Sequence, residues 1–212
     1  MTVKADTRLR RLPERGSKDL QLAHGIIDES RICHVGFTLD RQPYVVPMAL
    51  GRDGDHILLH GSVVSRLMTN LADGLPCCVT ITHLDGLVLA RSAFNSSMNY
   101  RSLMVFGSAS LVSDEMEKKR GLDILVEHLA PGRLADLRPS TRKELNATTL
   151  LTLPLEIFSI KSRSGPPGDA KRDLNAPIWA GVIPLALTAG NPVPAPDMPA
   201  DVTLPGYLKR LS

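Results

Sequence analysis

Three short β-type runs joined by tight turns constrain the fold of this chain more than any other feature. Apolar residues alternate in 32–39, a second run covers 44–50, and a third is Ile57-Leu58-Leu59. Residues 40–43 separate the first two runs, and Arg52-Asp53-Gly54-Asp55 is a hairpin signal before the third. A parallel crossover needs about a dozen residues or more, so these connections predict an antiparallel meander.

The rest of the sequence adds more β-type runs than helices. Helices are expected at 17–30, 62–74 and 114–129, with Ser17 and Ser62 as the N-caps of the first two. Further strands are expected at 77–82, 87–90, 103–112, 148–153 and 157–161, with a break at Gly86. Six or more short antiparallel strands predict a mainly β fold with a closed or half-closed barrel, because closure removes exposed strand edges.

Charge and composition argue against several classes of protein. The 25 Lys and Arg residues exceed the 22 Asp and Glu residues only by three, and they are spread along the chain. Nucleic-acid-binding proteins concentrate their basic residues on one face. No apolar run reaches the ~18 residues of a membrane-spanning helix, and residues 1–17 lack the apolar centre of a signal peptide. We therefore expect a cytoplasmic protein that binds neither nucleic acid nor membranes.

The chain is expected to form one long domain with two polar ends. Residues 1–16 are polar and basic and predict an N-terminal arm, and residues 17–184 carry the barrel. Residues 185–212 are rich in proline and predict an extended C-terminal tail. The three cysteines include no CxxC pair, and no two histidines lie four residues apart on an expected helix, so we expect reduced thiols and no metal site.

The segment from His60 to Arg66 is the first candidate for ligand binding. It lies where a strand ends and a helix begins, so free backbone N–H groups, two serine hydroxyls and a guanidinium can together bind an anion. Gly61 would let a ligand approach the backbone closely. A capped surface helix with Arg66 in solvent explains the same pattern, and both interpretations stay open.

The segment from Arg91 to Ser102 is the second candidate. Its twelve residues include two arginines, two asparagines, four serines and a tyrosine, and they lead directly into an apolar strand. This density of hydrogen-bonding groups suits recognition of a heteroaromatic or polar ligand, although a polar loop that satisfies its own backbone is the alternative. Trp179, the only tryptophan, can cover a flat ring or belong to the core.

Several of these segments together resemble a known family in order and spacing. They are Glu14–Ser17, His34–Phe37, Pro43–Met48, His60–Arg66, Gly86–Phe94, Ser97–Ser102 and Trp179–Pro184. Over roughly residues 11–184 the chain resembles the flavin-nucleotide-binding proteins related to pyridoxamine 5'-phosphate oxidase, a group that includes the nitroimidazole-resistance proteins. The resemblance implies a split β-barrel of the FMN-binding type, a homodimer, and FMN in clefts at the dimer interface.

The resemblance also implies roles for single residues. Ser65 and Arg66 match a group that holds the FMN phosphate, but Leu67 stands where the oxidase has a lysine. Ser62, Arg101 or a residue of the partner chain would then supply the missing charge. The expected cofactor-binding residues are Pro47, Met48 and Ala49 along the flavin ring and His60, Gly61, Ser62, Ser65 and Arg66 in the phosphate segment. They also include Arg101 and Ser102, which would reach the ring or phosphate from the other subunit, the neighbouring Asn99 and Tyr100, and Trp179.

Three functions stay open at this point. The first is an FMN-dependent oxidoreductase that acts on a small organic substrate, for example by reducing nitro groups or quinones. The second is a carrier or sensor that binds a flavin or haem without turnover, and the third is a barrel that has lost its ligand. Oxidation of pyridoxamine phosphate itself is not expected, because the substrate-binding arginine and histidine of that oxidase have no match in the tail. No catalytic residue is assigned.

Overall fold

The computed structural model describes residues 5–210, so residues 1–4 of the expected arm and 211–212 of the expected tail lie outside it. The helices are α1 (Leu20–Glu29), α2 (Arg66–Ala72), α3 (Glu115–Leu129) and α4 (Arg142–Ala147), with 3-10 turns η1 (Pro13–Arg15), η2 (Arg133–Asp136), η3 (Lys171–Asp173) and η4 (Leu208–Arg210). The strands are β1 (Gly16–Ser17), β2 (Cys33–Leu39), β3 (Gln42–Met48), β4 (Leu50–Asp53), β5 (His56–Ser62), β6 (Pro76–Leu89), β7 (Ser97–Ser108), β8 (Ser110–Leu111), β9 (Thr148–Pro154), β10 (Ile157–Arg163) and β11 (Gly181–Pro184).

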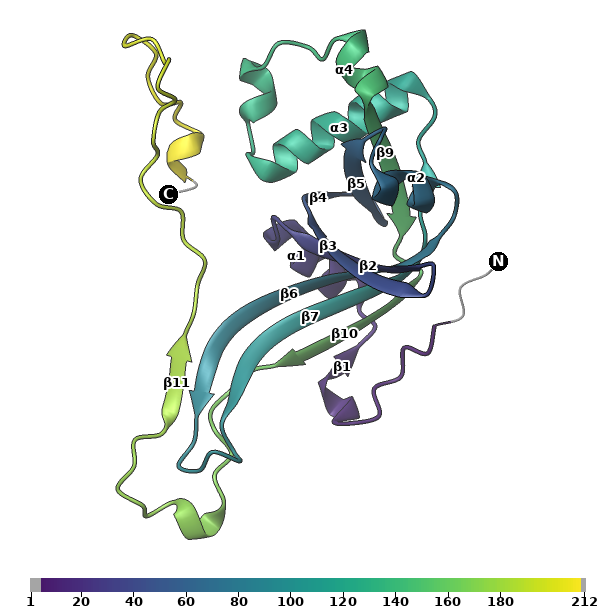
Figure 1. The fold of residues 1–212 in the computed structure, drawn as a ribbon. Helices are drawn as coiled ribbons and strands as arrows, with labels where there is room; N and C mark the ends of the chain where they lie inside the picture. The colour runs from purple at the N-terminus through teal and green to yellow at the C-terminus, as the bar shows by residue number, and fades with distance from the viewer. Residues whose placement is uncertain (1–4, 211–212) are drawn as a thin grey trace.

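The described strands form two antiparallel sheets (Figure 1). The larger sheet has the order β1-β10-β7-β6-β2-β3, with β11 added beside β6, and the smaller one has the order β4-β5-β9-β8. The chain turns from one sheet into the other at Ala49, at Ala109 and at 155–156. These corners confirm the expected mainly β architecture and the split β-barrel.

Alternation along the strands fills the space between the two sheets. In β2 the side chains of Cys33 and Val35 are fully buried and Phe37 nearly so, whereas the residues between them face outward. Each large apolar side chain buried in this way stabilises the fold by about 1.5–3 kcal/mol. The central members of the core, all at most 1% exposed, are Ile57, Leu59, Val79, Ile81, Leu103, Val105, Leu151, Leu153 and Ile160.

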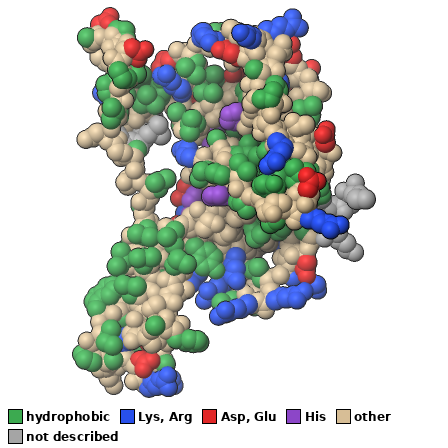
Figure 2. All heavy atoms as spheres, in the orientation of Figure 1, with side chains coloured by type: hydrophobic (Ala, Val, Ile, Leu, Met, Phe, Trp, Pro, Cys, Tyr) green, Lys and Arg blue, Asp and Glu red, His purple; other side chains and the backbone are tan. Residues whose placement is uncertain are grey.

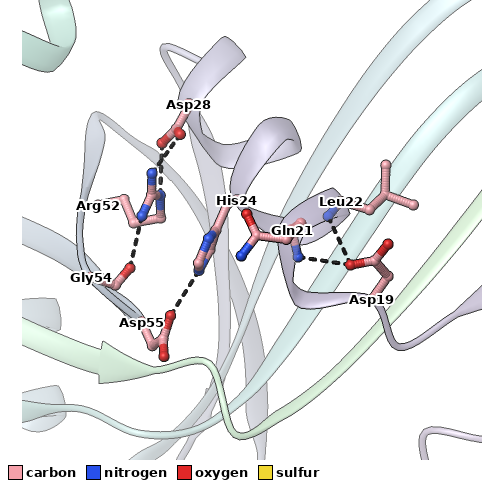
Figure 3. A network of polar contacts seen from close by, with 8 residues as sticks. All are labelled: Asp19, Gln21, Leu22, His24, Asp28, Arg52, Gly54 and Asp55. Atoms are coloured by element: carbon pink, nitrogen blue, oxygen red, sulfur yellow. Dashed lines mark hydrogen bonds and ion pairs between the residues drawn. The ribbon is translucent and has the colours of Figure 1, made fainter.

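Polar contacts attach α1 to the hairpin between β4 and β5 (Figure 3). Arg52 donates from Nε and Nη2 to both carboxylate oxygens of Asp28, at 2.8 and 2.6 Å. His24 Nε2 lies 2.9 Å from a carboxylate oxygen of Asp55. The helix starts after Asp19, whose carboxylate accepts from the backbone N–H groups of the first turn, and not after the expected cap Ser17. These contacts fix the end of α1, which leads to Arg31.

Beyond the barrel, β6 and β7 continue as a long hairpin, and β11 pairs with the outer end of β6 (Figure 1). We call residues 84–100 and 164–184 the arm. It is a different part of the molecule from the N-terminal arm expected at residues 1–16. The two strands expected at 77–82 and 87–90 are one strand here, because the register shifts between Leu84 and Gly86 without ending the pairing. A Cβ atom on Gly86 would lie 3.0 Å from the carbonyl oxygen of Ile183, so this glycine lets β11 lie close.

After Pro184 the tail leaves the sheet and runs beside the body of the molecule (Figure 1). Its residues are exposed until Tyr207, whose ring packs on Gly132 and whose hydroxyl donates to Asp136. Arg133 donates to the same hydroxyl at 3.2 Å. Figure 2 shows openings between the tail and the body, with histidine side chains on the adjoining face. The tail is therefore held at its two ends and is open between them.

The helices differ from the expected ones mainly in their ends. The helix expected at 62–74 is shorter, because residues 62–65 form a turn in which the N–H of Ser65 donates to the carbonyl of Ser62. Its N-cap is thus Ser65 and not Ser62. The helix α4 was not expected, although Thr141 and Glu144 form a capping box before it. Within residues 5–210, no helix is both long and apolar enough to cross a membrane.

Candidate cofactor-binding site

A cavity of about 270 Å³ lies between α3 and the smaller sheet. Helix α3 begins after the N-cap Asp114 and lays Leu125 over Gly51 of β4, where a Cβ atom would come within 3.1 Å of it. The apolar wall consists of Ala49, Leu50, Leu122, Leu125, Val126 and Leu129. The polar groups at the cavity are Arg31, His60, His128, Ser140 and Thr148. An apolar pocket with a few polar groups is the usual form of an organic ligand site.

His60 has unused hydrogen-bonding capacity inside this cavity. It lies in β5, where it pairs with Leu150 of β9. Its Nδ1 atom is buried, and neither ring nitrogen is hydrogen-bonded to a described residue. Burial lowers the pKa of His60, so the imidazole is neutral at pH 7 and keeps a lone pair free. Nε2, which is less buried than Nδ1, is therefore the nitrogen that a ligand in the cavity could contact.

His128 reaches the same cavity from the last turn of α3, but it is hydrogen-bonded. Its Nε2 atom lies 2.6 Å from the carbonyl oxygen of Ser30. A carbonyl only accepts, so Nε2 carries a proton and donates it to this oxygen. The contact connects α3 with the loop after α1, whose next residue, Arg31, also lines the cavity.

The segment predicted to bind an anion forms the turn that follows His60. Ser62 accepts a hydrogen bond from the N–H of Val64 at 3.4 Å, and Ser65 caps α2 without a side-chain hydrogen bond. The Arg66 guanidinium lies over the Tyr44 ring, 4.9 Å from its centre, and it has no acidic partner among residues 5–210. Arg66 is therefore a cation that remains available to an anion.

Gly61 has a packing role that the sequence did not indicate. A Cβ atom there would lie 2.7 Å from Cγ of Met68, so the glycine lets α2 pack directly on β5. The close approach of a ligand at Gly61 stays a prediction.

Of the three residues expected along a flavin ring, one reaches the cavity. Ala49 lines it, at the corner between β3 and β4. Pro47 and Met48 end β3, where they pair with His34 and Cys33 of β2. The structure thus brings Ala49 and His60 into one site.

Three of the four polar residues expected from β7, namely Asn99, Arg101 and Ser102, have side-chain hydrogen bonds within the chain. Arg101 donates to both carboxylate oxygens of Asp85, at 3.0 and 2.7 Å, and to Glu29. These hydrogen bonds hold the pKa of Glu29 below its ordinary value and raise that of Arg101. Asn99 is buried, donates to the carbonyl of Gly165 at 3.2 Å and accepts from Arg163, and the Ser102 hydroxyl lies 3.3 Å from that of Thr82. Tyr100 pairs with Leu84 and Arg163.

Trp179 lies on the arm and is 64% exposed. Its ring lies over Gly181, where a Cβ atom would come within 2.9 Å of it. The lining of the cavity includes neither Trp179 nor the β7 residues Asn99–Ser102, so these expected residues and His60 do not form one pocket within a single chain.

Sequence analysis missed His128 and Arg31. His128 follows the apolar stripe of α3 by one turn, which was the available signal, but a single histidine at a helix end is common. Arg31 comes near it only because α1 is attached to the β4–β5 hairpin. In the described part of the chain, no three His, Cys, Asp or Glu residues are grouped so that they could hold a metal ion.

Comparison with known families places this geometry in context. The model of the pyridoxamine 5'-phosphate oxidase family matches residues 19–162. No curated protein sequence matches significantly.

Two solved structures are similar over nearly the whole chain. The FAD and haem binding protein from Mycobacterium smegmatis is 38% identical, with a TM-score of 0.90, and the match covers 93% of this chain and 97% of that one. The flavocytochrome Anf3 from Azotobacter vinelandii is 37% identical, with a TM-score of 0.91, and the match covers 97% and 96%.

Proposed function

Because the chain belongs to the pyridoxamine 5'-phosphate oxidase family, we propose that it is a redox protein that binds a flavin and a haem. The observation that carries the proposal is the apolar cavity with the half-buried imidazole of His60, which has no hydrogen-bond partner among the described residues. The names of the two similar structures, an FAD and haem binding protein and a flavocytochrome, support it. When bound, a flavin can accept two electrons at once, whereas haem iron exchanges electrons one at a time. The two groups together could therefore connect a two-electron donor with a one-electron acceptor.

For the flavin we propose FAD, and not the FMN expected from the sequence. The support is the match to the FAD and haem binding protein, which extends over 93% of the chain. We propose Arg66 as the cation for the flavin phosphates, because its guanidinium is exposed and has no acidic partner among the described residues. Arg101 is not proposed for this role, because two carboxylates already neutralise it.

The residues of the cavity fit an iron porphyrin. Its apolar wall suits a flat hydrophobic macrocycle, and Arg31 can pair with a carboxylate at its edge. His60 offers a neutral imidazole, which is a ligand that iron accepts. At about 270 Å³ the cavity is slightly smaller than pockets that enclose a whole organic ligand, so only part of a macrocycle can enter it.

We propose further that the protein is a homodimer. A compact monomer of 23.0 kDa exposes about 9,600 Å², whereas this chain exposes 13,689 Å². The excess of about 4,000 Å² per chain is more than enough for an obligate dimer, whose two protomers together bury roughly 2,000–5,000 Å² or more. On the arm, Leu87 pairs with Met98 and with Ile183, and all three expose more than a third of their surface on the same face. A second copy is the partner that would cover this face.

The absorbance spectrum of the full-length protein, purified from cells supplied with a haem precursor, tests the proposal. We expect flavin bands and a haem Soret band, with FAD identified by mass spectrometry after release. Flavin without haem, also after incubation with haemin, would reduce the protein to a simple flavoprotein and contradict the proposal. A colourless protein that neither cofactor stabilises against heat would leave only a barrel without a ligand.

A further inference from the structure

We propose that His60 is the protein ligand to the haem iron and that the iron-bearing part of the macrocycle lies in the cavity between α3 and the smaller sheet. This inference rests on the proposed haem binding and assigns the atom that holds the metal. Three observations lead to it: the unpaired ring of His60, the absence of a bare-metal site, and the chemistry of the cavity walls.

The first observation is which nitrogen of His60 can reach a ligand. Nδ1 is shut off from solvent and has no partner, whereas Nε2 also lacks a hydrogen bond but is not fully buried. Because His60 lines the cavity, Nε2 is the nitrogen that a bound group can contact. An imidazole nitrogen in this position, without a hydrogen-bond partner, can offer its lone pair to a metal.

The second observation concerns the kind of metal that one imidazole can hold. Metal ions in proteins usually need three or more side-chain ligands. Residues 5–210 include no such group, and His60 and His128 are the only metal-ligating side chains in the cavity lining. A metal that brings four nitrogen ligands of its own needs only one from the protein, and iron porphyrin is such a group.

The third observation is the distribution of polarity around His60. The wall opposite the smaller sheet is apolar, formed by Leu122, Leu125 and Val126 of α3. The one cation in the lining is Arg31, whose single side-chain hydrogen bond is long, 3.3 Å to the carbonyl of Asp28. An apolar surface, one imidazole and a lightly held guanidinium match the ring, the iron and a propionate of haem.

His128 provides the matched comparison. It lines the same cavity, but its Nε2–H is donated to the carbonyl of Ser30 at 2.6 Å. This hydrogen bond fixes the helix end against the loop that carries Arg31, so we assign His128 a positioning role in the wall. The two histidines should therefore respond differently to substitution.

The test is a haemin titration of the full-length protein and of two variants, His60→Ala and His128→Asn, followed by absorbance and electron paramagnetic resonance spectra. His60→Ala should bind haemin at least about 10-fold more weakly and lose the spectrum of histidine-ligated iron. Adding free imidazole should restore that spectrum, because it can occupy the space that the side chain leaves. His128→Asn removes this hydrogen bond but leaves His60 in place, so it should keep the ligand signature.

The outcomes separate this inference from the proposed function. If the unmodified protein binds no haem, the proposed function fails. If His60→Ala binds haemin with unchanged affinity and spectrum, or if His128→Asn is the variant that loses the signature, haem binding stands and the assignment of His60 is wrong. Far-ultraviolet circular dichroism and the flavin content of each variant show whether it folds. A flavin lost from His60→Ala while haem is retained would also overturn the assignment.

Discussion

The barrel covers its apolar side chains more completely than the arm does. Strand β7 passes through both parts and allows a direct comparison. In the barrel its side chains Leu103 and Val105 are fully buried, whereas on the opposite face of the strand Met104 is 38% exposed and Met98, on the arm, is 49% exposed. The alternation along the strand is the same in both parts. The barrel places a second layer on the inner face, while one face of the arm has no layer over it within the chain.

Polar groups show the reverse pattern. On the arm, Arg91 donates twice to the buried carboxylate of Asp169, both at 2.7 Å, and Asn99 is held by Gly165 and Arg163. Arg91 keeps one buried atom, Nε, without a partner, whereas in the barrel neither nitrogen of the His60 ring has a partner among residues 5–210. The comparison teaches that a segment dense in polar residues can be purely structural, and that unpaired groups are the better sign of a binding site.

The largest effect should come from removing a buried side chain of β7. Leu103→Ala should lower the free energy of unfolding by about 2–5 kcal/mol, because it leaves a cavity in a core that cannot collapse fully. Met98→Ala, five residues away in the same strand, should change the unfolding of the chain far less. Urea denaturation monitored by circular dichroism measures both. Equal losses would mean that the arm is packed as tightly as the barrel.

Breaking the ion pair inside the arm should have the next largest effect. Asp169 is almost fully buried and Arg91 about a quarter exposed, so Asp169→Ala would leave a poorly hydrated cation and cost about 2 kcal/mol, less than for a fully buried pair. The control is Arg138→Ala, which removes an exposed ion pair with Glu144 and should leave the denaturation midpoint unchanged. If Asp169→Ala left the free energy of unfolding unchanged, the loop at 164–180 would not stabilise the arm.

A charge on the uncovered face of the arm tests whether a second copy covers it. Leu87→Asp should weaken the homodimer by about 10-fold or more, because an unpaired carboxylate would be buried at the interface. Met116→Asp, on an exposed position of α3, should leave the association unchanged. Sedimentation velocity over a range of concentrations measures the dissociation. A monomeric unmodified protein would contradict the dimer, and a stable Leu87→Asp dimer would place its interface elsewhere.

The smallest effect should come from the ion pair between Arg101 of β7 and Glu29 of α1. Arg101 holds the pKa of Glu29 below its ordinary value of 4.5, so the pair stabilises the folded chain above that pH and the stabilisation is lost as the pH falls through the folded value. Arg101→Gln should therefore lower stability by about 1 kcal/mol near neutral pH, with a smaller difference near pH 3. Urea midpoints at both values of pH measure this. A difference that grows in acid would contradict the assigned sign.

Local patterns predicted the strands because their causes are local. Asp40 and Arg41 both have positive φ angles, of 49° and 65°, and form a two-residue turn within the connection expected at 40–43. The errors are at element ends, where capping decides. Asp19 replaced Ser17 as a cap because its carboxylate reaches two backbone N–H groups, and the turn at 62–65 delayed α2.

The candidate site was only half predictable. His60 and Ala49 were expected as cofactor-binding residues, and both line the cavity. The polar residues Asn99 and Arg101 looked equally suited to a ligand, and only their partners 66 and 72 residues away show that they are occupied. No pattern in a single sequence reveals such partners.

By itself, the sequence determined two tight antiparallel hairpins and the mainly β class, because turn residues and alternating side chains act over a few positions. The expected three-strand meander was wrong, because the second run is divided at Ala49 between the two sheets. The family was indicated by the resemblance of several segments. Only the tertiary structure decided which polar groups remain free. It placed α3 over the smaller sheet, so that His128 and Arg31 meet His60 around one cavity, and it neutralised Arg101 with carboxylates from two other elements. Whether a side chain can bind a ligand depends on the partners it already has, and those are set by contacts between segments that are distant in the chain.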